Sequence, residues 1–180
     1  AVDPLGQIAE ALRTAPGGPA ADRGSRRGRR RWLHVDAAYG GAALFSDRLA
    51  PLLAGISQAD SVALDLHKLG WQPVPAGVFL TPDASAWQRL DGEIAYLNPA
   101  DDTAAGLVSL VGRSLRTTRR ADAFKIATTF RALGRRALGA MVDACHDLAL
   151  HAAAAVDADP RLERAAPVTL STGLFRYRPA

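Results

Sequence analysis

The chain has 180 residues, of which 48% are hydrophobic and 22% are charged, with a formal net charge of +4. This is the composition of a globular protein and excludes disorder over the whole length. No apolar run approaches the roughly 20 residues that span a bilayer, so we expect no membrane association. The only cysteine, Cys145, excludes an intrachain disulfide and a cysteine-based zinc cluster; it fits a reducing compartment and a cytoplasmic protein.

A basic segment lies near the start of the chain. Residues 8–13 have the apolar spacing of a short helix, which the Pro-Gly-Gly-Pro stretch at 16–19 ends. Six of the 22 basic residues then fall within 23–31, where no apolar period is present. Such a run could attract a phosphate backbone, and a basic binding module is the alternative function from a different class. No aromatic or second basic stripe accompanies it, so we interpret it as a surface loop and expect no nucleic-acid partner.

Two short apolar runs, residues 33–35 and 61–66, each end on ionisable side chains. Asp36 follows the first run, and His67 and Lys68 follow the second. Their Val and Leu content and a connector with a helical pattern at 44–56 predict two neighbouring, parallel, buried strands. Ligands of open α/β sheets bind outside the carboxyl ends of such strands. We therefore expect the carboxylate of Asp36 and the amine of Lys68 to open into one crevice.

A lysine at the end of an apolar strand is a poor choice for stability, because burying an unpaired ammonium is costly. Its functional use there is as an amine that forms a Schiff base. The structural alternatives are a lysine that reaches water and, for Asp36, a turn or helix-capping residue. Pyridoxal phosphate enzymes need both a lysine and an acidic group that keeps the pyridine nitrogen protonated. Together, Asp36 and Lys68 match that requirement.

The rest of the chain continues the mixed α/β pattern. Residues 91–112 are polar and lack a clear period, and loops of this length are often lids or binding loops. This stretch contains Tyr96. The other expected elements are a strand at 76–80, antiparallel to its neighbours, helices at 83–90, 121–134 and 137–157, and strands at 162–165 and 169–177.

Four motifs occur in order: HVDAAYGG at 34–41, DSVALDLHKLGWQP at 60–73, YLNP at 96–99 and SLRTTRRADAFK at 114–125. Together they resemble the group II pyridoxal-phosphate-dependent amino-acid decarboxylases, which include aromatic-amino-acid, glutamate and diaminobutyrate decarboxylases. Apart from the arginine-rich loop, the resemblance covers the chain from Val2 to Tyr177.

The resemblance implies an α/β fold of the fold type I, aspartate-aminotransferase-like class. Residues 1–115 would be the C-terminal part of the large cofactor-binding domain. Residues 116–180 would be the connecting helices and the start of the small C-terminal domain. The resemblance also implies pyridoxal 5'-phosphate as the cofactor, an amino-acid substrate and a homodimer.

Five site residues follow from the matching motifs. Lys68 would form the Schiff base, and Asp36 would pair with the pyridinium nitrogen. Ala38 would pack its methyl group against one face of the ring. His67 would contact the cofactor phosphate or, in the alternative interpretation, be a core histidine. Tyr96, on a mobile loop, would protonate the substrate carbon after carbon dioxide leaves.

The residues of these motifs most resemble those of the diaminobutyrate and lysine decarboxylase branch, which predicts a diamino acid as the substrate. An aromatic amino acid or glutamate is the alternative. Asp65 stands where some family members carry an asparagine that faces the phosphate, which an aspartate would repel. Because family members run well over twice this length, we interpret the sequence as an internal piece. We expect the isolated 180 residues to bind the cofactor poorly and turn over little; an inactive gene remnant is a further alternative.

Overall fold

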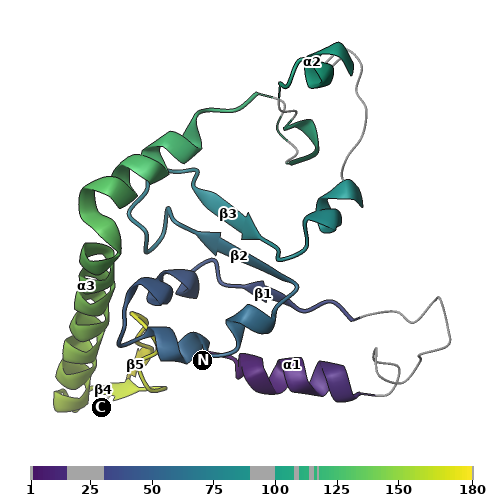
Figure 1. Cartoon of the computed structure of the whole chain (residues 1–180). Coiled ribbons are helices and arrows are strands. Elements are labelled where there is room, and N and C mark those ends of the chain that lie inside the picture. Colours follow the sequence, from purple (N-terminus) through teal and green to yellow (C-terminus); the bar gives the residue numbers. More distant parts are fainter. Residues whose placement is uncertain are drawn as a thin grey trace.

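A computed structural model describes residues 2–15, 31–89, 100–107, 110–113, 116 and 118–179. Most of the arginine-rich stretch and the YLNP motif with Tyr96 lie outside the described residues. Figure 1 shows a small central sheet with the long helix α3 along one side. The longer elements are α1 (Leu5–Thr14), β1 (His34–Asp36), β2 (Ser61–Asp65), β3 (Gly77–Leu80), α2 (Ala100–Ala104), α3 (Asp122–Ala158), β4 (Leu162–Arg164) and β5 (Phe175–Tyr177). Five short 3₁₀ helices complete the list: η1 (Gly40–Phe45), η2 (Ala50–Leu53), η3 (Ile56–Gln58), η4 (Ala84–Arg89) and η5 (Val111–Arg113).

The three central strands have the order β1-β2-β3. Strand β1 runs parallel to β2, with Asp36 opposite Ala63, and β3 runs antiparallel to β2. The prediction of two neighbouring parallel strands followed by an antiparallel one is therefore confirmed. Because β1 and β2 are parallel, the residues that follow them emerge at the same edge of the sheet.

The connector between β1 and β2 differs from the single helix predicted at 44–56. It consists of the three turns η1, η2 and η3. Pro51 is the second residue of η2 and lacks the N–H that an α-helix would use. Gly55 adopts a left-handed φ of 95°, which interrupts the helical path before η3. The apolar residues of this connector nevertheless face the core, since Leu49 and Leu53 are buried in one core cluster.

Helix α3 confirms the prediction of two consecutive helices. The break lies at Gly134, whose φ of 69° and ψ of 170° favour glycine. The second half packs against η1, with Leu138 and Val142 buried. The first half is less buried than its apolar pattern predicts, because Phe124 is 74% exposed. None of the helices in the described part of the chain is long and apolar enough to cross a membrane.

The C-terminal strands β4 and β5 pair antiparallel to each other and lie beside the second half of α3 (Figure 1). The predicted strand at 169–177 is shorter than expected. Its first residues form a tight turn, in which the backbone groups of Thr169 and Thr172 exchange hydrogen bonds of 3.0 and 2.9 Å. This turn reverses the chain, so that β5 runs back alongside β4.

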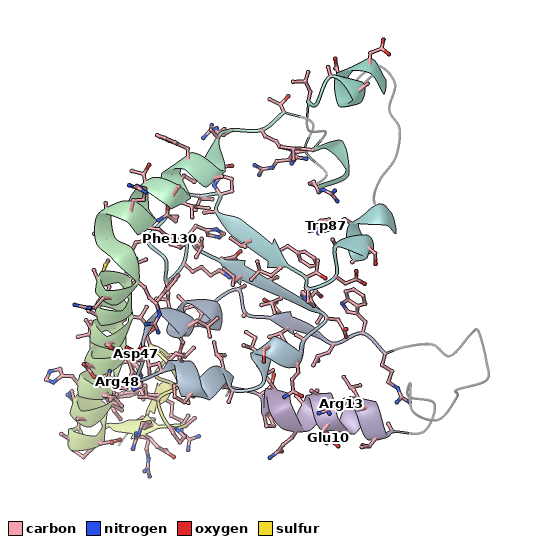
Figure 2. All side chains as sticks on the ribbon, viewed as in Figure 1. Glu10, Arg13, Asp47, Arg48, Trp87 and Phe130 are labelled. Atoms are coloured by element: carbon pink, nitrogen blue, oxygen red, sulfur yellow. The ribbon has the colours of Figure 1, made fainter. Side chains whose placement is uncertain are left out.

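Several ion pairs lie on the surface, including Glu10–Arg13 on α1 at 2.7 Å and Asp47–Arg135 at 2.6 Å; Figure 2 labels Glu10, Arg13 and Asp47. The hydrogen bond from Arg135 and its charge lower the pKa of Asp47. Hydrogen bonds from the side chain and backbone of Arg161 lower the pKa of Asp159 to about 2.

Candidate active site

A pocket of about 400 Å³ lies at the carboxyl ends of β1 and β2. Asp36 and Lys68 both line it, together with Ala38, Tyr39 and Leu170. The volume is within the range of small-molecule sites. The expectation that the two strand ends open into one crevice therefore agrees with the structure.

Asp36 is the last residue of β1, and its side chain organises the turn that follows. Its Oδ1 accepts a hydrogen bond from the backbone N–H of Ala38 at 3.0 Å. The Ala38 carbonyl in turn accepts from the N–H of Asp65 at 3.2 Å, which fixes the turn to the end of β2. Asp36 therefore acts as a turn residue, which was the structural alternative to a cofactor-binding role. The structure shows no ion pair to Asp36 from another described residue, so its charge is available to a cationic ligand atom.

Lys68 lies in the turn after β2 rather than in a buried strand end. Its side chain is 42% exposed, and its Nζ lies 3.1 Å from Oδ2 of Asp65. The amine is therefore partly exposed and paired, as in the structural alternative of a lysine that reaches water. The chain reverses directly after Asp65, and this turn brings the amine into both solvent and the pocket.

His67 points to the other side of the same turn. Its Nδ1 accepts a hydrogen bond from the backbone N–H of Ala76 at 3.2 Å, which ties the turn to the segment before β3. The neutral ring therefore carries its proton on Nε2, which lies 3.6 Å from Oδ2 of Asp65. His67 does not line the pocket of Asp36 and Lys68. Its contact with a cofactor phosphate stays a prediction, and the geometry accounts for it as a structural histidine.

Asp65 and Leu170 were not predicted as site residues. One carboxylate oxygen of Asp65 lies near both Lys68 and His67, and the spacing of three residues to Lys68 is the signal that could have indicated the pair. Leu170 reaches the pocket from the C-terminal turn. Its distance along the sequence gives no local signal. The predicted catalytic residue Tyr96 lies outside the described residues.

Comparison with known proteins identifies the family to which this site belongs. The family described as "Pyridoxal-dependent decarboxylase conserved domain" matches residues 3–178. The chain belongs to the pyridoxal-dependent decarboxylases. The predictions of the family and of a fold type I α/β structure are confirmed.

Two relatives of this chain are named L-2,4-diaminobutyrate decarboxylase. The protein from Rhizobium meliloti (strain 1021) is 49% identical over 148 residues, which cover 81% of this chain and 29% of that protein. The protein from Acinetobacter baumannii is 38% identical over 148 residues, covering 82% of this chain and 29% of that protein. The chain thus spans less than a third of the length of these relatives.

A solved structure of this family has a similar fold. It is the glutamate decarboxylase domain of diaminobutyrate-pyruvate transaminase and L-2,4-diaminobutyrate decarboxylase from Vibrio parahaemolyticus. That structure matches with a TM-score of 0.71 and 30% identity, over 98% of this chain and 30% of that one. The described part of the chain therefore corresponds to a portion of a larger decarboxylase fold.

The pocket has groups that fit pyridoxal phosphate, the cofactor of the family. The amine of Lys68 can bind the aldehyde carbon, and the carboxylate of Asp36 can hold a proton on the ring nitrogen. The small side chain of Ala38 leaves room for a flat ring. Lys68 is the sole cation among the described lining residues. These residues therefore provide the ring and aldehyde contacts but no second cation for the phosphate.

Proposed function

We propose that the complete protein decarboxylates an L-amino acid to an amine and carbon dioxide, using pyridoxal 5'-phosphate. The observation that supports this most directly is the placement of Asp36 and Lys68. They follow adjacent parallel strands and line one pocket in a chain of the pyridoxal-dependent decarboxylase family.

The roles of the residues follow from the chemistry of the pocket. When bound, pyridoxal phosphate supplies an electron sink for the pair of electrons left behind as the substrate carboxylate departs. Asp36 would keep the ring nitrogen protonated, and Lys68 would bind the aldehyde carbon and exchange protons there. Ala38 would support one face of the ring, and His67 would approach the phosphate. Tyr96 would return a proton to the substrate carbon while its loop excludes water.

We propose a diamino acid, diaminobutyrate or lysine, as the substrate. The support is the 49% and 38% identity with two proteins named L-2,4-diaminobutyrate decarboxylase. An aromatic amino acid or glutamate is the competing choice, since the family as a whole includes both activities.

We also propose a cytoplasmic homodimer. The support is the family resemblance for the dimer and the single cysteine for the compartment. We further propose a domain boundary near residue 115, between the large cofactor-binding domain and the connecting helices with the start of the small domain.

The test is carbon dioxide release from a panel of amino acids by the complete gene product. Replacing Lys68 with Arg keeps the positive charge but removes the primary amine. We expect release to fall by at least about a hundredfold, the size of an acid–base contribution alone. The matched control is Lys125→Arg, because Lys125 is the other lysine of this chain and binds the carbonyl oxygens of Pro73 and Pro75 instead. Full release by the Lys68→Arg protein would refute the proposal.

A further inference from the structure

Leu170 lines the Asp36–Lys68 pocket although it belongs to the C-terminal segment. It is one of the two corner residues of the turn closed by Thr169 and Thr172. Its φ of 52° lies in the left-handed region, where the corner residue of a tight turn is normally Gly, Asn or Asp. A leucine held in this conformation needs support from its surroundings, and such residues concentrate at functional sites.

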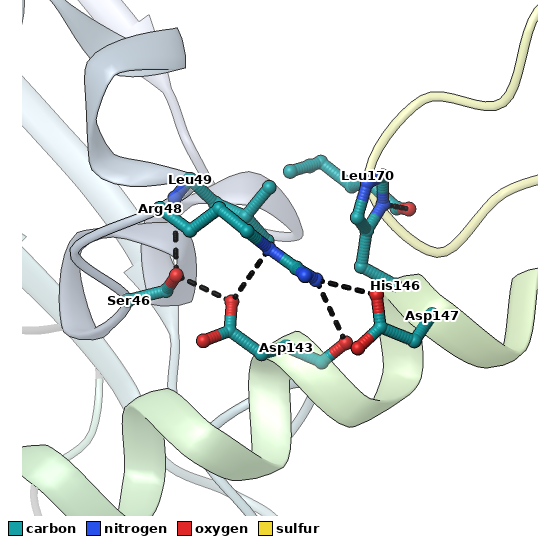
Figure 3. Close-up of polar contacts among 7 residues, drawn as sticks. All are labelled: Ser46, Arg48, Leu49, Asp143, His146, Asp147 and Leu170. Atoms are coloured by element: carbon teal, nitrogen blue, oxygen red, sulfur yellow. Dashed lines mark hydrogen bonds and ion pairs between the residues drawn. The ribbon is translucent and has the colours of Figure 1, made fainter. Parts of the chain in front are cut away.

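Two side chains from other parts of the chain fasten this turn. Nδ1 of His146, on α3, donates a hydrogen bond to the carbonyl oxygen of Leu170. The hydroxyl groups of Tyr39 and Ser171 form a second hydrogen bond, and Tyr39 itself lines the pocket. Figure 3 shows His146 of α3 beside Leu170 of the C-terminal turn, next to the place where Arg48 pairs with Asp147 of α3. The turn is therefore held at both corners, by α3 and by the segment that follows Asp36.

Leu170, like Val2, lines two neighbouring pockets. Besides the Asp36–Lys68 pocket, it lines a second pocket of about 390 Å³, which is bordered by Arg48, His146 and Thr169. Leu170 is 7% exposed and packs in the core cluster that contains Leu49 and Leu53. Its contact with the turn after Asp36 is close, since a Cβ added to Gly40 would lie 3.3 Å from Cδ1 of Leu170. Shortening this side chain would enlarge the Asp36–Lys68 pocket at this wall.

We propose that Leu170 is a specificity-determining residue that forms one wall of the pocket and limits the size of the aromatic ring that the pocket accommodates when its aldehyde is bound to Lys68. His146 is a positioning residue that holds this wall in place. The identity of the natural ligand, pyridoxal phosphate, depends on the proposed function. The assignment of Leu170 as a pocket wall depends only on its position, since it lines both pockets.

Two aldehydes of different size test the wall without the natural cofactor. The complete gene product, freed of bound aldehyde, is treated with pyridine-4-carbaldehyde or the larger quinoline-4-carbaldehyde. Cyanoborohydride fixes each to lysine amines, and peptide mass spectrometry measures labelling at Lys68 and, as an internal reference for unfolding, at Lys125. In the unsubstituted protein we expect the larger aldehyde to label Lys68 about tenfold less than the smaller one, the discrimination of a close-fitting apolar pocket. We expect Leu170→Ala to abolish most of this difference.

The control is Leu49→Ala, because Leu49 has similar burial in the same core cluster but does not line the Asp36–Lys68 pocket. It should retain the discrimination at Lys68. His146→Leu should behave like Leu170→Ala, whereas His146→Asn keeps an N–H donor for the Leu170 carbonyl and should resemble the unsubstituted protein. Equal discrimination in Leu170→Ala and in the unsubstituted protein, or its absence in both, would overturn the inference. Decarboxylation is measured separately, so a loss of the proposed function is distinguished from a loss of the wall.

Discussion

Ser46, a buried residue outside the pocket, forms two side-chain hydrogen bonds that connect separate segments. It is 1% exposed, its Oγ donates to Oδ1 of Asp143 at 2.6 Å, and the same oxygen accepts from the N–H of Leu49 at 3.0 Å (Figure 3). It thus connects the segment after η1 with helix α3. Because Ser46 is buried, water cannot easily replace these bonds.

Replacing Ser46 with Ala should lower the free energy of unfolding by about 1–3 kcal/mol, since the N–H of Leu49 and the carboxylate of Asp143 each lose a partner. Urea unfolding of the complete gene product measures this change. The control is Ser57→Ala, at an exposed position in η3, which should change the free energy by no more than about 0.5 kcal/mol. An unchanged urea midpoint for Ser46→Ala would show that these bonds contribute nothing net.

The site residues Asp36, Lys68 and Asp65 differ in how far the sequence could predict them. Asp36 and Lys68 were predictable as a pair because each directly follows an apolar strand, and parallel strands place their ends together. The partner of Lys68 was not predicted. Asp65 was considered only for its effect on a phosphate, whereas the turn after β2 brings its carboxylate to 3.1 Å from the lysine amine. Turn geometry decided this contact.

At the scale of elements, the contact between α3 and η1 depends on a missing side chain. A Cβ placed on Gly139 would overlap the carbonyl oxygen of Phe45, so the two backbones can approach only because this residue is glycine. The neighbouring side chains Leu138 and Val142 fill the rest of this contact. Replacement cannot be relieved by a side-chain rotation, because backbone atoms are in the way.

We therefore expect Gly139→Ala to destabilise the protein by about 1–3 kcal/mol, the usual effect of overpacking, despite the better helix propensity of alanine. Thermal unfolding of the complete gene product gives the measurement. Gly173→Ala is the matched control, because no atom lies within 4 Å of the added methyl group and its φ is unexceptional. A Gly139→Ala protein as stable as this control would contradict the packing argument.

Element types were predicted well where the apolar period was long and less well where it was short. The two halves of α3 and the break at Gly134 followed from the pattern and the glycine. The connector at 44–56 has the apolar spacing of a helix but forms 3₁₀ turns, because Pro51 and Gly55 prevent a continuous backbone path. Burial of Leu49 and Leu53 requires only that these side chains face the core, and short turns achieve this as well as a helix does.

For the whole molecule, the composition of the pocket predicts how the isolated chain handles its cofactor. Lys68 is the sole cation among the described lining residues, so a phosphate group gains little there. We expect the isolated 180 residues to bind pyridoxal phosphate and phosphate-free pyridoxal with similar, weak affinity. The complete gene product should strongly prefer the phosphate form. Absorbance titration, with borohydride trapping on Lys68, measures both affinities, and submicromolar binding of pyridoxal phosphate by the isolated chain would contradict the expectation.

The sequence by itself determined the family, the parallel pairing of two strands and the pair of Asp36 and Lys68 at their ends. These features depend on residues that are close in sequence, and on the rule that parallel strands end together. Only the tertiary structure decided the exposed position of Lys68 and the place of Leu170 in the pocket wall. The first depends on the geometry of the turn after β2, and the second on contacts between distant segments, namely the hydrogen bond from His146 to Leu170 and the packing of the C-terminal turn against the strand ends. Local patterns carry no information about such contacts, because they form only when the chain has folded.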